Sequence, residues 1–125
     1  MLIDDEEPVN FLNSMLVTKS GLTADVHSFR SAEKALSYLE GEPVDPSKSM
    51  LILLDINMPV LNGWDFLERY EKAGFTKSWN AVIVMLTSSI DPLDSERASK
   101  SPLVAEYMTK PLSTEKINHI LQHHF

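Results

Sequence analysis

MLILL, residues 50–54, and VIVML, residues 82–86, are the two stretches that decide the fold class. Both are short and apolar at every position, and both are made of the Ile, Val, Leu and Met side chains that fill buried strands. Strands without a polar side are typical of a parallel sheet that helices cover on both faces. The sequence therefore predicts such a sheet, with these two segments in its middle.

Three more short apolar runs alternate with helical stretches along the chain. The expected strands are residues 1–3, 25–29, 50–54, 81–86 and 104–108. Capping residues, first-turn prolines and terminal glycines mark five helices, which begin near Pro8, Ser31, Trp64, Asp91 and Ser113. In the first helix we expect one apolar stripe made of Val9, Leu12, Leu16 and Val17. Five strands alternating with five helices predict an α/β fold with helices on both faces of the sheet.

The composition narrows the class of function. A chain of 125 residues suffices for one domain, so residues 1–125 are expected to form a single folded unit. The net charge of −7 and the lack of any Lys/Arg cluster argue against a nucleic acid or an anionic membrane as partner. The absence of cysteine excludes thiol chemistry, and the acidic start MLIDDEE is unlike a secretion signal, so we expect a cytoplasmic protein.

Polar side chains follow four of the five expected strands. Asp4 and Asp5 follow the first, Asp55 the third, Thr87 the fourth and Lys110 the fifth. Each alone could be an ordinary solvated turn residue, but the carboxyl ends of parallel strands meet at one edge of a sheet, where ligands bind. Three carboxylates, a hydroxyl and an ammonium at one place suit a Mg²⁺ ion and a phosphoryl group. A carboxylate can itself be the phosphoryl-accepting nucleophile.

Four segments in this order resemble the response-regulator receiver domains of two-component signalling, and the resemblance covers essentially the whole chain: LIDDEEP (2–8), ILLDINMPVLNGWDFL (52–67), VIVMLTSS (82–89) and YMTKPL (107–112). It implies a three-layer, flavodoxin-like (βα)5 fold with the strand order 2-1-3-4-5. It also implies a chain that accepts a phosphoryl group on an aspartate with the help of Mg²⁺, for which Mn²⁺ can substitute. Because Phe125 ends the sequence, the chain resembles the stand-alone receivers.

Carried over position by position, the resemblance assigns the phosphoacceptor to Asp55, the metal ligands to Asp4, Asp5, Asp55 and the Asn57 backbone carbonyl, and the catalytic or switch roles to Lys110, Thr87 and Tyr107. Within the acidic pair, Asp5 matches the direct ligand. The resemblance further implies a cis peptide bond between Lys110 and Pro111, which are the kind of residues that permit one. Gly63 matches the end of the turn that leads from the phosphoacceptor into the next helix.

The resemblance also implies the partners. A sensor histidine kinase or a histidine phosphotransfer protein would donate the phosphoryl group, and an unknown downstream protein would bind the face made by the fourth helix, the fifth strand and the fifth helix. The chain would be a monomer or a phosphorylation-dependent dimer. It would catalyse only its own phosphorylation and dephosphorylation, and so would not be an enzyme with external substrates.

Two departures from the family pattern concern the backbone: only three residues precede Asp4, and SKSPLVAEY, residues 99–107, lacks a glycine that the family often has there. Three other functions remain as alternatives. A flavin-binding protein needs a phosphate loop where this chain has DDEEP, which would repel a phosphate. A haloacid-dehalogenase-like phosphohydrolase needs a second aspartate where Asn57 stands. A pseudo-receiver would be an interaction module that is not phosphorylated.

The four histidines are interpreted as structural or exposed residues. His27 lies in an expected strand, whereas His119, His123 and His124 lie on the last helix without a carboxylate at metal-site spacing. Trp64, Trp79 and Met58 are expected to serve packing.

Overall fold

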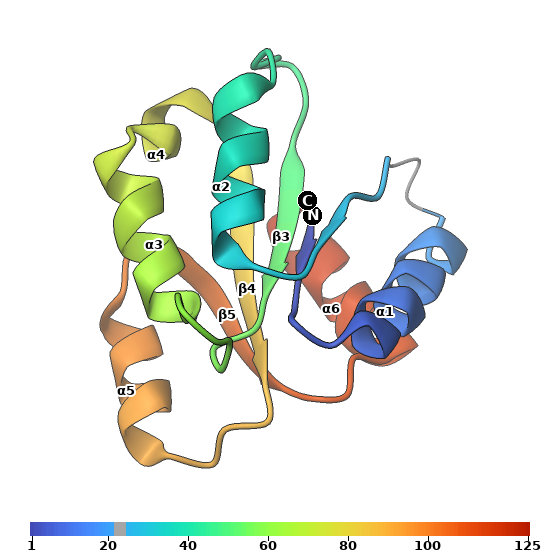
Figure 1. Cartoon of the computed structure of the whole chain (residues 1–125). Helices are drawn as coiled ribbons and strands as arrows, with labels where there is room; N and C mark the ends of the chain where they lie inside the picture. The colour runs from blue at the N-terminus through green and yellow to red at the C-terminus, as the bar shows by residue number, and fades with distance from the viewer. Residues whose placement is uncertain (22–24) are drawn as a thin grey trace.

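The computed structural model describes residues 1–21 and 25–125 and has three layers, with a sheet between two layers of helices (Figure 1). The sheet order is β2-β1-β3-β4-β5, and neighbouring strands are parallel. The strands are β1 (Leu2–Ile3), β2 (Ser28–Phe29), β3 (Met50–Leu54), β4 (Ala81–Thr87) and β5 (Val104–Thr109). The fold class and the strand order expected from the sequence are confirmed.

The described residues contain one helix more than expected. The helices are α1 (Glu7–Lys19), α2 (Ala32–Gly41), α3 (Gly63–Lys72), α4 (Phe75–Ser78), α5 (Pro92–Lys100) and α6 (Thr114–His124). The expected fourth and fifth helices are thus α5 and α6, and α4 is an additional single turn. It forms because Gly74, at φ 78°, redirects the chain after α3 and lets Phe75 pack edge-on against Tyr70, 5.5 Å between ring centroids.

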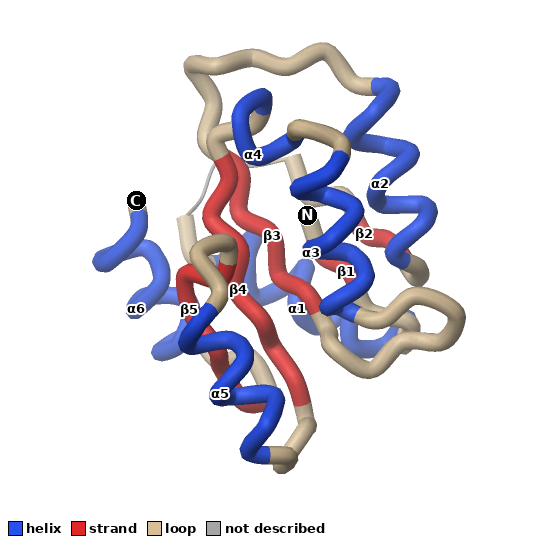
Figure 2. Tube along the Cα trace, turned by 90° about the vertical axis from the view of Figure 1, so that its left-hand side faces the viewer, coloured by secondary structure: helices blue, strands red, loops and turns tan. Residues whose placement is uncertain are grey.

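The core is divided into two parts by the sheet. Alternate side chains of β3 and β4 point to opposite faces, so Ile52 packs beneath α2 and α3 whereas Leu53 packs beneath α1 and α6. Figure 1 shows the two helical layers on either side of the strands, and Figure 2 shows the same sheet turned by 90°, with α6 beside β5 at its edge. Because both faces are covered, β3 and β4 can be apolar throughout.

The expected apolar stripe of α1 is confirmed only in part: Val17 is buried and Leu16 packs against the same core cluster, but Leu12 faces solvent and two asparagines take inward positions. Asn10, Asn13 and Val17 are the buried residues of this helix, and Leu12 is 58% exposed. The Asn10 side-chain amide donates hydrogen bonds to the Asp4 carbonyl at 2.9 Å and to the Phe29 carbonyl at 3.2 Å. These bonds turn the helix so that its polar side faces the ends of β1 and β2.

The strand ends differ slightly from the expectation. The strand expected over residues 25–29 is reduced to Ser28–Phe29, because β2 pairs only with the two-residue strand β1. In contrast, β4 and β5 each extend one residue further than expected, to Thr87 and Thr109, which pair with each other.

Among the described residues, no helix combines the length and the apolar character that a bilayer crossing requires.

Candidate functional site

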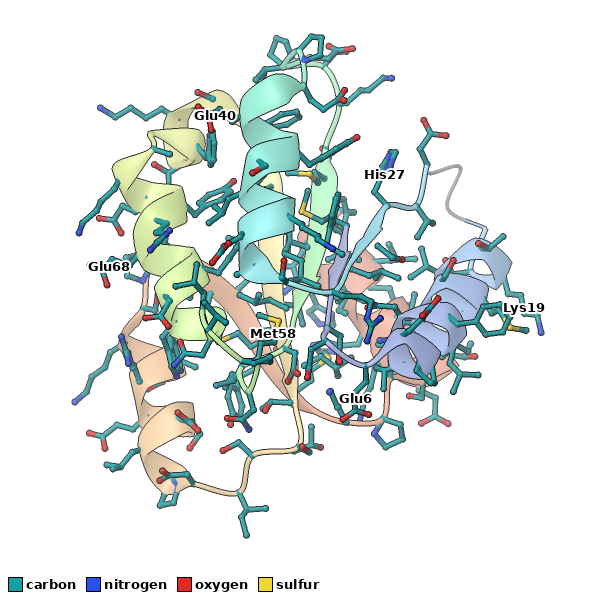
Figure 3. The ribbon with its side chains drawn as sticks, viewed as in Figure 1. Glu6, Lys19, His27, Glu40, Met58 and Glu68 are labelled. Atoms are coloured by element: carbon teal, nitrogen blue, oxygen red, sulfur yellow. The ribbon has the colours of Figure 1, made fainter. Side chains whose placement is uncertain are left out.

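The carboxyl ends of four strands bring the expected site residues together. Asp4 and Asp5 follow β1, Asp55 follows β3, Thr87 ends β4 and Lys110 follows β5. The backbone fixes these positions, since the Asp55 N–H donates to the Ile3 carbonyl at 2.9 Å and the Lys110 N–H donates to the Thr87 carbonyl at 2.8 Å. Figure 3 shows Glu6 and Met58, which lie in the loops after β1 and β3, at this same end of the molecule.

Three carboxylates lie in one cluster. Asp4, Asp5 and Asp55 each offer an oxygen, and these oxygens all lie within 4.8 Å of one another. Burial raises the pKa of Asp55 to about 6, and the charge of Asp4 raises it too, whereas Lys110 and the Asn57 N–H act in the opposite direction. Among the described residues, the cluster therefore has three carboxylates but only one positive charge close to them, that of Lys110. Its hard oxygen donors and this shortage of charge fit Mg²⁺ or Mn²⁺.

Lys110 supplies the positive charge that the described residues place in the cluster. Its Nζ lies 2.6 Å from Asp4 Oδ2 and 3.5 Å from Asp55 Oδ1. Burial works to lower the pKa of Lys110, but the hydrogen bond to Asp4 and the charges of Asp55 and Asp4 outweigh it and raise the pKa. The peptide bond between Lys110 and Pro111 is cis, as expected. The ammonium is thus held charged between two carboxylates.

The loop between β3 and α3 is shaped around Asp55. A Cβ on Gly63 would lie 2.6 Å from the Asp55 carbonyl oxygen, so glycine is required for this close approach. The Gly63 N–H donates to the Ile56 carbonyl at 2.8 Å, and Asn62 caps α3 in a capping box with Asp65. Met58 is buried in the loop, which confirms its expected packing role. The loop and the helix cap together hold Asp55 in place.

Val60 lies at the exposed tip of this loop. Its φ of 69° belongs to the left-handed region, which a β-branched residue rarely adopts, and its side chain is 88% exposed. The neighbouring Asn57 side chain is exposed as well, and its N–H donates to the Asp55 carboxylate. This bond places the Asn57 backbone against the cluster, while the metal-binding role of its carbonyl stays a prediction.

Comparisons with known proteins agree with this geometry. The sequence model of the family described as the response regulator receiver domain matches residues 1–122. The chain belongs to this family. A crystal structure of a two component response regulator from Cytophaga hutchinsonii is 31% identical, with a TM-score of 0.84 over 97% of this chain and 91% of that one.

Two curated relatives of this receiver are regulatory proteins. The probable methanogenesis regulatory protein FilR2 of Methanothrix harundinacea is 27% identical over 98% of the receiver and 77% of its own length. The heme response regulator HssR of Staphylococcus epidermidis is 27% identical over 91% of the receiver and 45% of its own length. The matched region is therefore less than half of HssR.

The expected switch residues of the receiver are connected through Ser89. Thr87 is fully buried, and its Oγ1 accepts a hydrogen bond from the Ser89 N–H at 3.1 Å. Tyr107 is half-buried. Burial and the charge of Asp94 raise the pKa of Tyr107, and a hydrogen bond with Ser89 acts against them. Ser89 thus contacts both residues to which the family resemblance gives a switch role.

One contact of the receiver was missed by the sequence reasoning. The Ser89 hydroxyl donates to Asp94 Oδ2 at 2.6 Å, and Trp64 Nε1 donates to Asp94 Oδ1 at 3.1 Å. The Arg97 guanidinium lies over the Trp64 ring, 4.5 Å from its centroid. Trp64 is buried, as expected for packing, but it also links α3 to α5. No sequence signal relates Trp64 to Asp94, because 30 residues separate them.

The histidines lie outside the carboxylate cluster. His27 is exposed, and its ring lies 4.9 Å from the Tyr38 ring. The expectation that the histidines of the last helix lack a carboxylate partner is wrong. Glu106 of β5 reaches His119 and His124, because β5 and α6 pack side by side although 13 and 18 residues separate these partners in the sequence.

Proposed function

We propose that this receiver accepts a phosphoryl group on Asp55, from a phosphohistidine of a sensor kinase or phosphotransfer protein or from a small phosphodonor. The observation that supports this most is the environment of Asp55. It is a buried carboxylate beside Asp4, Asp5 and Lys110, at the edge of a receiver-type sheet. No other carboxylate among the described residues lies in such a cluster.

The transfer step needs Asp55 in its charged form. With a pKa of about 6, Asp55 is mostly ionised at neutral pH and can act as a nucleophile. One carboxylate oxygen attacks the phosphorus, the bond from phosphorus to the donor nitrogen breaks, and the electron pair of that bond stays with the departing imidazole. Asp55 then carries an acyl phosphate. A Mg²⁺ ion held by Asp4, Asp5, Asp55 and the Asn57 carbonyl would neutralise charge on the phosphoryl oxygens.

Lys110 and Thr87 would hold the transferred group. The ammonium already lies between Asp4 and Asp55, so it can bind a phosphoryl oxygen by a small movement. The Thr87 hydroxyl can donate a hydrogen bond to another phosphoryl oxygen. In doing so it would move away from the Ser89 N–H, from which it now accepts a hydrogen bond. Moving Thr87 and Ser89 frees Tyr107 to turn inward. The change would reach the face made of α5, β5 and α6, where a downstream protein or a second copy would bind.

The receiver would also reset itself. Water attacks the phosphorus of the acyl phosphate, the bond from phosphorus to the Asp55 oxygen breaks, and inorganic phosphate leaves with the carboxylate restored. In both steps the chain acts only on itself, so it would not be an enzyme for outside substrates. Ser89 lies near the site on the loop after β4, where it could influence the lifetime of the acyl phosphate.

Intact-mass spectrometry after incubation with acetyl phosphate and MgCl₂ tests the proposal. The wild type should gain the mass of one phosphoryl group, and Asp55→Asn should gain none. Asp45→Asn is the matched control, because Asp45 is an exposed aspartate whose carboxylate accepts hydrogen bonds from the nearby Ser47. It should behave like the wild type, and chelation of Mg²⁺ should abolish the gain. An unmodified wild type would instead favour the pseudo-receiver alternative, and a modified Asp55→Asn variant would refute the assignment.

A further inference from the structure

Lys116 lies at a position of α6 where a cation is unfavourable. It is the third residue of the helix, which begins at Thr114 after the N-cap residue Ser113. The peptide dipoles leave partial positive charge in the first turn of a helix, so acidic side chains are favoured there and basic ones are not. The Lys116 N–H donates to the Ser113 hydroxyl at 3.2 Å. The ammonium at the end of the side chain therefore needs partners of its own.

The side chain of Lys116 finds these partners in the loop between β5 and α6. Its Nζ donates to the Thr109 carbonyl at 2.5 Å and to the Pro111 carbonyl at 2.8 Å. These two carbonyls belong to the residues directly before and after Lys110. One side chain of α6 thus binds the loop on both sides of the lysine that reaches the carboxylate cluster.

The peptide unit that leads into Lys110 is held at both of its polar ends. Its carbonyl, which belongs to Thr109, accepts from Lys116, and its N–H, which belongs to Lys110, donates to the Thr87 carbonyl at 2.8 Å. One of these contacts comes from α6 and the other from β4. The Pro111 carbonyl adds a third fixed point on the far side of Lys110. The backbone of Lys110 is therefore anchored between two elements of the fold.

The position of this backbone decides where the Lys110 ammonium lies. The side chain is 18% exposed, and its Nζ lies 2.6 Å from Asp4 Oδ2 and 3.5 Å from Asp55 Oδ1. A lysine side chain is long and loses much rotamer freedom when it is held in one place. A group that binds a reacting atom has to stay within about 0.5 Å of its productive position. An ammonium on a long side chain meets this demand only if the backbone that carries it is fixed.

We propose that Lys116 is a positioning residue for Lys110, and that it acts by binding the two carbonyls that flank Lys110. Among the described residues, Lys110 is the cation that pairs with the carboxylate cluster, so Lys116 acts through the backbone and not on Asp55 directly. The effect on the rate of phosphorylation rests on the function proposed above. The effect on the position of the Lys110 ammonium does not.

NMR spectra of the lysine ammonium groups test the contact without any phosphorylation. In the wild type, Lys110 Nζ should give a separate ¹H–¹⁵N signal, because an ammonium held between two carboxylates exchanges its protons slowly. Lys116→Met keeps a long aliphatic side chain without the charge, and it should shift and broaden that signal. Lys116→Arg should preserve it, since a guanidinium can donate to both carbonyls. Lys72→Met is the matched control, because Lys72 is an exposed lysine of α3 paired with Glu68.

The rate of phosphorylation tests the consequence. With acetyl phosphate and MgCl₂, intact-mass spectrometry over time should show Lys116→Met phosphorylated about three- to tenfold more slowly than the wild type, because a misplaced reacting group slows the transfer. Lys116→Arg should recover most of the rate, and Lys72→Met should match the wild type. In a Lys110→Met background, Lys116→Met should cause little further loss, since residues that act as one unit are not additive.

Three results would overturn the inference. The first is an unchanged Lys110 ammonium signal in Lys116→Met, and the second is a wild-type rate of phosphorylation in that variant. The third is an equal loss of rate with and without Lys110, which would mean that Lys116 acts by another route. A wild type that takes up no phosphoryl group would contradict the proposed function instead, and the ammonium signal would still decide the role of Lys116.

The variants of Lys116 should fold, because its side chain is partly exposed and lies at the surface of the loop. Circular dichroism verifies that they do. Lys116→Gln is the second variant for the same comparisons, in case Lys116→Met is poorly folded. It should shift the Lys110 signal and slow the transfer in the same direction, and wild-type behaviour of this variant would equally contradict the inference.

Discussion

Asp55 carries its charge in an environment that opposes it. Its side chain is buried beside the charge of Asp4, and these two causes raise its pKa from 3.8 to about 6. Between these two pH values the folded chain binds more protons than the unfolded chain at this residue. The stability of the fold therefore decreases as the pH rises through this window, and at neutral pH the ionised carboxylate destabilises the protein.

Replacing Asp55 by asparagine should remove this destabilisation. At pH 7.5 we expect Asp55→Asn to be more stable than the wild type by roughly 1–3 kcal/mol, and at pH 4 the difference should largely disappear. Urea unfolding at both pH values, without Mg²⁺, measures the effect. Equal stability of the two proteins at pH 7.5 would show that ionised Asp55 does not destabilise the fold. A larger stability difference at pH 4 than at pH 7.5 would show that the pKa of Asp55 is not raised.

The same pair of proteins reports on the metal. Mg²⁺ that binds the carboxylate cluster should stabilise the wild type more than Asp55→Asn, because the variant lacks one ligand and the charge that the ion would neutralise. Asp45→Asn, which alters an exposed loop residue, should respond to Mg²⁺ as the wild type does.

At the scale of elements, Asp94 joins α5 to α3. It accepts hydrogen bonds from Ser89 at 2.6 Å and from Trp64 at 3.1 Å. Since Ser89 also contacts Thr87, the position of α5 is tied to the residue that would sense the phosphoryl group. The contact helps to hold α5 against α3, and the fluorescence of Trp64 reports on whether the contact is present.

Asp94→Ala should break this connection. We expect a loss of about 1–2 kcal/mol in unfolding free energy, because two hydrogen bonds are removed and the indole N–H is left partly buried. The emission of Trp64 should shift to the red as α5 loosens, measured in a Trp79→Phe background. Glu96→Ala is the control on the same helix, since Glu96 forms an exposed ion pair with Lys100. An unchanged emission spectrum would show that Asp94 does not hold Trp64 in place.

The elements also show where sequence reasoning succeeds and where it fails. β3 and β4 could be predicted because strands covered on both faces must be apolar at every position. The inward position of Asn10 on α1 could not be predicted, because its burial depends on hydrogen bonds to the backbone carbonyls of Asp4 and Phe29. The pairing of Glu106 with His119 could not be predicted either, because it depends on how β5 and α6 pack against each other.

At the scale of the whole molecule, the strand order explains the site. The order β2-β1-β3-β4-β5 places the ends of β1, β3, β4 and β5 side by side, and so brings residues 4, 55, 87 and 110 to one edge. This convergence could be predicted from the alternation of strands and helices. The distances between these side chains could not be predicted. In particular, nothing in the sequence indicates that Lys110 lies closer to Asp4 than to Asp55.

The same arrangement predicts how a local change would spread. Thr87 ends β4, pairs with Thr109 of β5 and contacts Ser89, so it is placed to connect Asp55 with the face of α5, β5 and α6. Tyr107 pairs with Met85 two residues before Thr87, on the strand next to β4. We therefore expect coupling between the site and this face to need the Thr87 hydroxyl and not its methyl group.

Comparing Thr87→Ala with Thr87→Ser separates these two parts of the side chain. Both variants should still accept a phosphoryl group on Asp55, because neither removes the nucleophile. In ¹H–¹⁵N NMR spectra, acetyl phosphate and Mg²⁺ should shift the amides of residues 104–109 in the wild type and in Thr87→Ser. The shifts should be largely lost in Thr87→Ala, which has no hydroxyl to follow the phosphoryl group. If Thr87→Ala shows the full shifts, the signal must pass to β5 by another route, with Lys110 as the remaining contact between Asp55 and that strand.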